Sequence, residues 1–220
     1  MKVLAVDTTS ERESVALAEG GVLRAEVRLR TAAGHSRMVL PAIAFALEAT
    51  GWVAADVDGY AVTVGPGSFT GLRVGLSTVQ GLALASGRPC LGVSTLDVLA
   101  AGIEGEAPTL VAMVDAGRGD QVFAAVYDAR ACVRDGPWAE APEEVAERLQ
   151  GPAAFVGDGA ERYRARIVAR RPDALFPRRG LFLAGTLARL AEPRLAAGEG
   201  IPPGALRPLY LRAADTRAAT

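Results

Sequence analysis

Two aspartates stand where an apolar strand gives way to a polar turn. Asp7 follows the run Lys2 to Val6, and Asp115 follows the run Leu110 to Val114. Nucleotide-binding α/β proteins hold a metal ion or a phosphate at the carboxyl ends of such strands. An acid in this position also commonly caps its own turn. With the glycines of a later polar turn, the candidate nucleotide-site residues are Asp7, Asp115, Gly157 and Gly159.

A glycine-rich segment, Gly65 to Gly81, leads from an apolar strand into a predicted helix over 69–86. Its turn suits a phosphate at a helix N-terminus, but it lacks the Lys-Ser or Lys-Thr of a Walker A loop and the spacing of a dinucleotide-binding turn. Within the helix, Gly71, Gly75 and Thr78 leave one face with almost no side chain. Because glycine costs a helix about 1 kcal/mol relative to alanine, we expect close packing there, against the chain's own sheet or helices or against a helix of another subunit.

A second predicted helix, over 36–50 with Ser36 as N-cap, is apolar on two sides. The stripe suited to a sheet consists of Leu40, Ile43 and Leu47. The other stripe consists of Met38, Ala42, Phe45 and Ala49. A helix that is apolar all round is buried on both sides. In a chain of 220 residues, this pattern favours a protein–protein interface over a deeper core.

Other reactive side chains are few. His35 is the only histidine. A two-histidine metal site therefore cannot be assembled, and a Ser-His-Asp triad could not be built without His35. Cys90 and Cys132 stand in apolar surroundings without C-x-x-C spacing, and we interpret both as reduced packing residues. The arginines from Arg162 to Arg179 form a basic run, for which we favour a solvated face over an RNA contact.

The composition excludes several classes of protein. Half of the residues are hydrophobic and 22% are charged, which is typical of a folded chain. A net charge of -1 gives no overall attraction to nucleic acid or to a membrane surface. The longest apolar stretch, Met38 to Leu47, is too short to span a bilayer, and an acid breaks the N-terminal apolar run too early for a signal peptide. We expect a cytoplasmic protein with no membrane partner.

The pattern of strand, aspartate, polar turn and strand occurs twice, since Asp115 lies 108 positions after Asp7. This favours a duplicated unit, although two unrelated hairpins would also give the pattern. The expected architecture is an α/β protein with two lobes, residues 1–102 and 103–220, with the alternative that the tail packs back on the first lobe.

Five motifs together resemble the bacterial TsaB family, also called YeaZ. They are Val6-Asp-Thr-Thr-Ser10, Gly34-His-Ser36, Gly65-Pro-Gly-Ser-Phe-Thr-Gly-Leu-Arg73, Val114-Asp-Ala116 and Pro208-Leu-Tyr-Leu-Arg212. The resemblance implies a duplicated actin/hexokinase-like fold (ASKHA, ribonuclease H-like) with a degenerate second lobe. It also implies a part in installing threonylcarbamoyl on N6 of adenosine 37 (t6A37) in tRNAs that read codons beginning with A.

The same resemblance implies partners. In that system a paralogue, TsaD, transfers the threonylcarbamoyl group, and an ATPase, TsaE, completes the complex. TsaD holds its metal partly through H-x-x-x-H on the helix that matches residues 35–39 here, where the fifth position is Val39. One ligand cannot hold a catalytic metal. We therefore expect a non-catalytic subunit with no cofactor in the isolated chain, ATP being used by the assembled complex and tRNA reached through it.

The family's dimer contact uses the two helices described above. The predicted partner interface, for TsaD or for a homodimer when TsaD is absent, consists of Met38, Val39, Ala42, Phe45, Gly71, Leu72, Gly75, Leu76, Thr78 and Val79. The competing hypothesis is an independent ATPase or small-molecule kinase that holds a nucleotide between the lobes with Asp7, Asp115 and the turn at 157–159. A metalloprotease fails on the histidine count.

Overall fold

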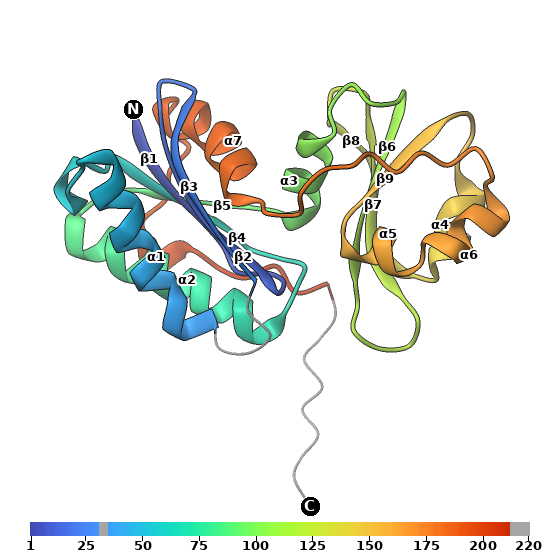
Figure 1. The fold of residues 1–220 in the computed structure, drawn as a ribbon, viewed down its shortest axis with the longest axis horizontal. Coiled ribbons are helices and arrows are strands. Elements are labelled where there is room, and N and C mark those ends of the chain that lie inside the picture. Colours follow the sequence, from blue (N-terminus) through green and yellow to red (C-terminus); the bar gives the residue numbers. More distant parts are fainter. Residues whose placement is uncertain (31–34, 212–220) are drawn as a thin grey trace, which may run out of the picture.

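The computed structural model describes residues 1–30 and 35–211, which form two α/β lobes side by side (Figure 1). The first sheet has the order β3-β2-β1-β4-β5. Its strands are β1 (Lys2–Asp7), β2 (Arg12–Glu19), β3 (Val22–Arg30), β4 (Gly59–Thr63) and β5 (Cys90–Val93). The second sheet has the order β8-β7-β6-β9. Its strands are β6 (Thr109–Asp115), β7 (Val122–Asp128), β8 (Val133–Glu140) and β9 (Ala153–Val156).

The two sheets repeat one strand arrangement. In the first lobe, β1 pairs antiparallel with β2 and parallel with β4. In the second lobe, β6 pairs antiparallel with β7 and parallel with β9. The prediction of a duplicated α/β fold with two lobes is confirmed. Strand β8 was not predicted, because Gly136 and Pro137 lie inside it. An edge strand tolerates proline, since one side of it makes no ladder hydrogen bonds.

Helices cover both faces of the first sheet. On one face lie α1 (His35–Thr50) and α2 (Phe69–Ser86), side by side in Figure 1. Ser68 caps α2 by accepting a hydrogen bond from the Gly71 N–H, and Gly87 ends the helix in the left-handed conformation. On the other face lies α7 (Ala184–Ala196), which contacts β1, β2 and β4. The sheet is therefore buried on both sides.

The second lobe has smaller helices. These are α4 (Pro142–Arg148), α5 (Asp158–Arg162) and α6 (Arg164–Arg170), all on one face of its sheet. The sequence predicted a single helix over 160–169, but the chain breaks at Tyr163 and makes two short ones. Two single-turn helices, η1 (Ala54–Asp56) and η2 (Pro203–Ala205), complete the described part. Within residues 1–30 and 35–211, no helix is long and apolar enough to cross a membrane.

One further helix, α3 (Thr95–Gly102), lies between the lobes (Figure 1). Six of its eight residues are buried, and one apolar cluster joins α3 to strands of both sheets and to α7. Tyr127 on β7 donates a 2.8 Å hydrogen bond to Asp97 of α3, and burial raises the pKa of that tyrosine. The two lobes therefore share a core.

The last part of the chain packs on the first lobe. Beyond α7, Ile201 bridges to Cys90 of β5, and the Leu209 N–H donates to the Val64 carbonyl at 2.7 Å. The division at residue 102 therefore follows chain order but not the packing of residues 184–211. The sequence also predicted a helix over 181–190 limited by Pro193. The helix instead begins at Ala184 and continues through Pro193 to Ala196. Next to this proline, the Glu192 carboxylate accepts the N–H groups of Gly20 and Gly21 in the β2–β3 turn at 2.6 and 2.7 Å, which ties the helix to the first sheet.

The glycine face of α2 packs on the turn between β1 and β2. A Cβ atom at Gly71 would lie 1.9 Å from the Thr8 carbonyl oxygen, and one at Gly75 would lie 2.5 Å from Thr8 Oγ1. That hydroxyl donates to the Gly71 carbonyl at 2.7 Å. The close partner is thus the chain itself, and the interpretation of this face as a contact for another subunit's helix is wrong.

This contact gives a test of the fold. We expect Gly71→Ala to lower the free energy of unfolding by about 2–3 kcal/mol, because the new methyl group collides with backbone. The control is Gly81→Ala in the same helix, where a Cβ would meet nothing within 4 Å and should raise it by about 0.5–1 kcal/mol. Urea denaturation measures both, and equal effects would contradict the packing of Gly71 on Thr8.

Candidate functional site

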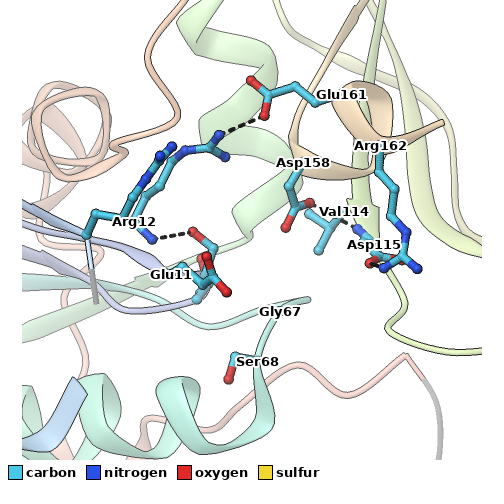
Figure 2. Close-up of a pocket in the computed structure, with 12 residues that line it drawn as sticks. Glu11, Arg12, Gly67, Ser68, Val114, Asp115, Asp158, Glu161 and Arg162 are labelled. Atoms are coloured by element: carbon cyan, nitrogen blue, oxygen red, sulfur yellow. Dashed lines mark hydrogen bonds and ion pairs between the residues drawn. The ribbon is translucent and has the colours of Figure 1, made fainter. Parts of the chain in front are cut away.

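A cavity of about 590 Å³ lies between the lobes. One wall comes from the β1–β2 turn, the end of β3 and the start of α2, and the other from the end of β6 and α5 (Figure 2). Its lining residues are Thr9, Ser10, Glu11, Arg12, Arg30, Gly67, Ser68, Val114, Asp115, Asp158, Glu161 and Arg162. Three arginines thus face four carboxylates.

Asp7 does not line this cavity. It is fully buried, and its Oδ1 accepts hydrogen bonds from the Thr9 N–H at 3.2 Å, the Thr9 hydroxyl at 2.7 Å and the Thr63 hydroxyl at 2.6 Å. These bonds fix the turn that lies against Gly71. The interpretation of Asp7 as a cap of its own turn accounts for the two bonds from Thr9, and the bond from Thr63 ties that turn to the end of β4.

Asp115 lines the cavity but is already paired. Its Oδ2 makes a 2.5 Å ion pair with Arg162 Nη1, an interaction that raises the pKa of the guanidinium. Its Oδ1 accepts from the Gly117 N–H at 3.2 Å and from the Tyr163 hydroxyl at 3.4 Å. The acid holds its own turn and α5 in place.

The two glycines of the later turn serve close packing on β6. A Cβ at Gly157 would lie 2.0 Å from the Met113 carbonyl oxygen, and one at Gly159 would lie 3.1 Å from the Asp115 nitrogen. Neither glycine is among the cavity-lining residues. The four candidate residues therefore do not converge on one point, since only Asp115 reaches the cavity.

Asp158, between these glycines, was not a sequence candidate. Its Oδ1 accepts the Asp115 N–H at 3.0 Å and the Gly159 N–H at 2.8 Å. Burial raises the pKa of Asp158, and these backbone bonds oppose the rise. The sequence also missed Arg12, which makes a 2.8 Å ion pair with Glu161 across the lobes (Figure 2). No spacing in the sequence could pair residues 149 positions apart.

Most arginines of the basic run from Arg162 to Arg179 form ion pairs or hydrogen bonds with other described residues. Arg171 is buried and donates to the carbonyl groups of Ala146 and Leu149. The other pairs of the run are Arg162 with Asp115, Arg166 with Glu143, Arg170 with Glu147 and Arg179 with Glu106. This pairing fits the interpretation as a solvated, charge-balanced face.

Metal ligands do not gather in the described part of the chain. Among residues 1–30 and 35–211, no group of three or more histidine, cysteine, aspartate and glutamate side chains could hold a metal ion. His35 begins α1, but its side chain lies outside the described residues. Val39, at the position of the second histidine in the H-x-x-x-H pattern, is 1% exposed within the first-lobe core.

Most of the predicted interface residues lie inside the first lobe. The buried ones are Val39, Ala42, Gly71, Leu72, Gly75, Leu76 and Val79. Thr78 is half-buried, while Met38 and Phe45 are 40% and 63% exposed. The core face of α1 is Val39, Ala42, Ile43 and Ala46. Leu40, which the sequence assigned to the sheet, is 56% exposed.

The exposed side of these two helices is strongly apolar. Five of the thirteen exposed large hydrophobic residues of the described chain lie on them: Met38, Leu40, Phe45, Phe69 and Leu84. We call these five residues the α1–α2 surface. A groove of about 440 Å³ runs between the helices beside Leu40 and Phe69. The Arg73 guanidinium lies 3.8 Å from the centre of the Phe69 ring. The Tyr210 ring packs against the same Phe69 ring, with 5.6 Å between the two ring centres.

Asp158 gives a prediction for pH dependence. Because its pKa is raised by folding, its contribution to stability is complete below the unfolded-state pKa of about 3.9 and is lost as the pH rises through the folded-state pKa. Asp158→Asn keeps an acceptor oxygen and removes that loss. We expect the difference in unfolding free energy between variant and parent to shift in favour of the variant from about pH 4 to 7, measured by urea denaturation. The control is Asp135→Asn at an exposed position of β8. An equal change of its unfolding free energy with pH would contradict the assignment of the effect to the buried Asp158 carboxylate.

Comparisons with known proteins agree with this architecture. Residues 3–176 match the family model described as TsaD, tRNA N6-adenosine threonylcarbamoyltransferase. The tRNA threonylcarbamoyladenosine biosynthesis protein TsaB of Escherichia coli K12 is 32% identical over 225 residues, covering 96% of this chain and 95% of the relative. The ROK hexokinase of Thermus thermophilus, at 13% identity and a TM-score of 0.53, covers 91% of this chain and 100% of its own and shares the fold alone.

The structure of YeaZ from Pseudomonas aeruginosa is far more similar. It superposes with a TM-score of 0.83 at 33% identity, covering 96% of this chain and 99% of its own. The actin/hexokinase-like fold expected from the sequence is therefore confirmed, and so is the resemblance that suggested it. A near full-length match in both sequence and structure shows that the chain belongs to the TsaB (YeaZ) family of tRNA threonylcarbamoyladenosine biosynthesis proteins.

Proposed function

We propose that the chain is a non-catalytic scaffold subunit that binds the TsaD transferase through the α1–α2 surface and activates it. The observation that carries this proposal is the exposure of five large apolar side chains, from 40% at Met38 to 74% at Leu84, on two adjacent helices. Full burial of one such side chain stabilises by about 1.5–3 kcal/mol. A surface of this kind is typical of a binding site for another protein.

The match to the transferase family model supports the choice of partner. That model covers residues 3–176, which include both helices. A partner with the same fold presents its own two matching helices, so the two chains would pack about a pseudo-twofold axis as in an isologous dimer. A second copy of this chain would compete for the same surface, which gives the homodimer when TsaD is absent. In this proposal TsaE joins the pair, and tRNA is reached through the complex.

The contacts of the aspartates support a subunit without a cofactor or reaction of its own. Asp7 is buried under three hydrogen bonds, and Asp115 is paired with Arg162. Neither carboxylate is placed to bind a nucleotide without losing these partners. In addition, α3 joins both lobes in one core, which opposes the lobe closure that kinases of this fold class depend on. ATP would then be used by the assembled complex.

The interface is tested by placing a charge on it. We expect Phe45→Asp and Leu84→Asp each to weaken association with TsaD at least about tenfold, because each buries an unpaired carboxylate in the complex. Val133→Asp is the matched control, since Val133 is 58% exposed on the second lobe. Analytical ultracentrifugation measures the affinity. Gly75→Leu is unsuitable, because Gly75 faces Thr8 inside the lobe.

If both surface variants bind TsaD as tightly as the parent chain, the proposed interface is wrong. If Val133→Asp weakens binding to TsaD equally, the loss of affinity is not specific to the α1–α2 surface, and the assignment of the interface to that surface is wrong. Circular dichroism of each variant establishes that the fold is retained.

The activating role is tested by reconstituting tRNA modification. We expect TsaD and TsaE to form t6A37 well below the rate seen when this chain is added, and the Phe45→Asp variant to restore little of that rate. Equal modification with and without the chain would exclude the scaffold role. Tight binding of Mg²⁺-ATP to the isolated chain by calorimetry, lost on Asp115→Asn, would instead favour the ATPase or kinase hypothesis.

A further inference from the structure

The charges that line the cavity between the lobes are not all paired. Arg12 is paired with Glu161, and Arg162 with Asp115. Glu11 is exposed at the rim. This leaves one cationic and one largely buried anionic group on the cavity walls, Arg30 and Asp158.

Asp158 is the anionic member. Both backbone N–H groups that it accepts bind its Oδ1, and no described residue donates to its Oδ2. No described arginine or lysine makes an ion pair with the carboxylate. Burial is the largest influence and raises the pKa of Asp158, while the more distant charge of Arg12 opposes the rise. Figure 2 shows it on the wall opposite Arg12 and Glu11. A buried carboxylate without a cation is costly, so a cationic group that entered the cavity would be favoured next to it.

Arg30 is the cationic member. It ends β3, is exposed, and lines the cavity, and it makes no ion pair with any carboxylate in residues 1–30 and 35–211. A guanidinium group binds carboxylates through two parallel hydrogen bonds. Arg30 is thus available to an anionic group on a bound molecule.

A small extension of the cavity supplies an independent observation. It has a volume of about 20 Å³ and shares Thr9, Ser10, Val114 and Asp158 with the main cavity. Thr95, at the start of α3, lines it with a side-chain hydroxyl that is buried and has no hydrogen-bond partner in the described chain. The residue is only 3% exposed. Buried hydroxyl groups are nearly always bonded, so the extension is suited to a polar group that donates to Thr95 Oγ1 and Asp158.

We propose that the cavity between the lobes binds a small zwitterion, an amino acid or similar amino carboxylate, with its ammonium group against Asp158 and Thr95 and its carboxylate against Arg30. A volume of about 590 Å³ is within the range of small-molecule sites. The lining holds three arginines and four carboxylates, so it offers a polyphosphate no excess of positive charge. The proposal is independent of the partner surface on α1 and α2.

A series of amino carboxylates tests the proposal and measures the spacing of the two charges. The probes are glycine, β-alanine, 4-aminobutanoate and 6-aminohexanoate, with butylamine and butanoate as matched compounds that carry a single charge. Isothermal titration calorimetry on the full chain is expected to show binding of at least one zwitterion. The single-charge compounds should bind at least about tenfold more weakly, because each leaves one charged wall group unpaired.

Variants then assign the binding to the two residues. We expect Asp158→Asn and Arg30→Gln each to weaken binding of the best probe at least about tenfold, with circular dichroism unchanged. Asp135→Asn and Arg88→Gln, both at exposed positions outside the cavity, are the matched controls and should bind as the parent does. The proposal is overturned if no zwitterion binds, if a single-charge compound binds as tightly, or if the two cavity variants retain the parent affinity.

Discussion

The burial of α3 by both lobes at once is the constraint on which the other parts of the molecule depend. Each sheet has one face covered by its own helices, and the remaining apolar faces need a common cover. A helix of eight residues with six of them buried supplies it, together with α7 on the first-lobe side. Because one apolar core joins the two sheets, the β1–β2 turn and α5 face each other across the cavity.

In the first lobe, α1 and α2 each have one side in the core and one side exposed to solvent. Gly71 and Gly75 let α2 lie directly on the β1–β2 turn, so the cost of glycine in a helix is offset by contact with the chain's own backbone. The core sides of α1 and α2 hold the sheet, and their outer sides keep five large apolar residues in solvent. The helices are therefore formed and packed on the sheet without a partner, and such preorganisation lowers the entropic cost of association.

The sequence was sufficient for features that repeat locally and insufficient for those that arise from topology. The strand, aspartate and turn pattern predicted the duplication, and the turn at 65–68 followed by an apolar run predicted α2 over 69–86. The phase of α1 was misjudged, because Val39 and Leu40 are equally apolar and only one faces the sheet. Likewise, a glycine face in a sequence does not tell whether Thr8 or another subunit covers it. Arg30 and Asp158 come from different lobes, and no spacing along the chain could bring them together.

The packing of α7 on the first sheet has a consequence for synthesis of the chain on the ribosome. The strands of the first lobe are complete once β5 has emerged, but the helix that covers their second face is finished 103 residues later, since β5 ends at Val93 and α7 at Ala196 (196 − 93). At typical rates of translation this delay is on the order of ten seconds. During that interval the nascent first sheet has one apolar face without its cover, and β6 to β9 must fold beside it. The chain is thus expected to need protection by chaperones until its C-terminal segment has been synthesised.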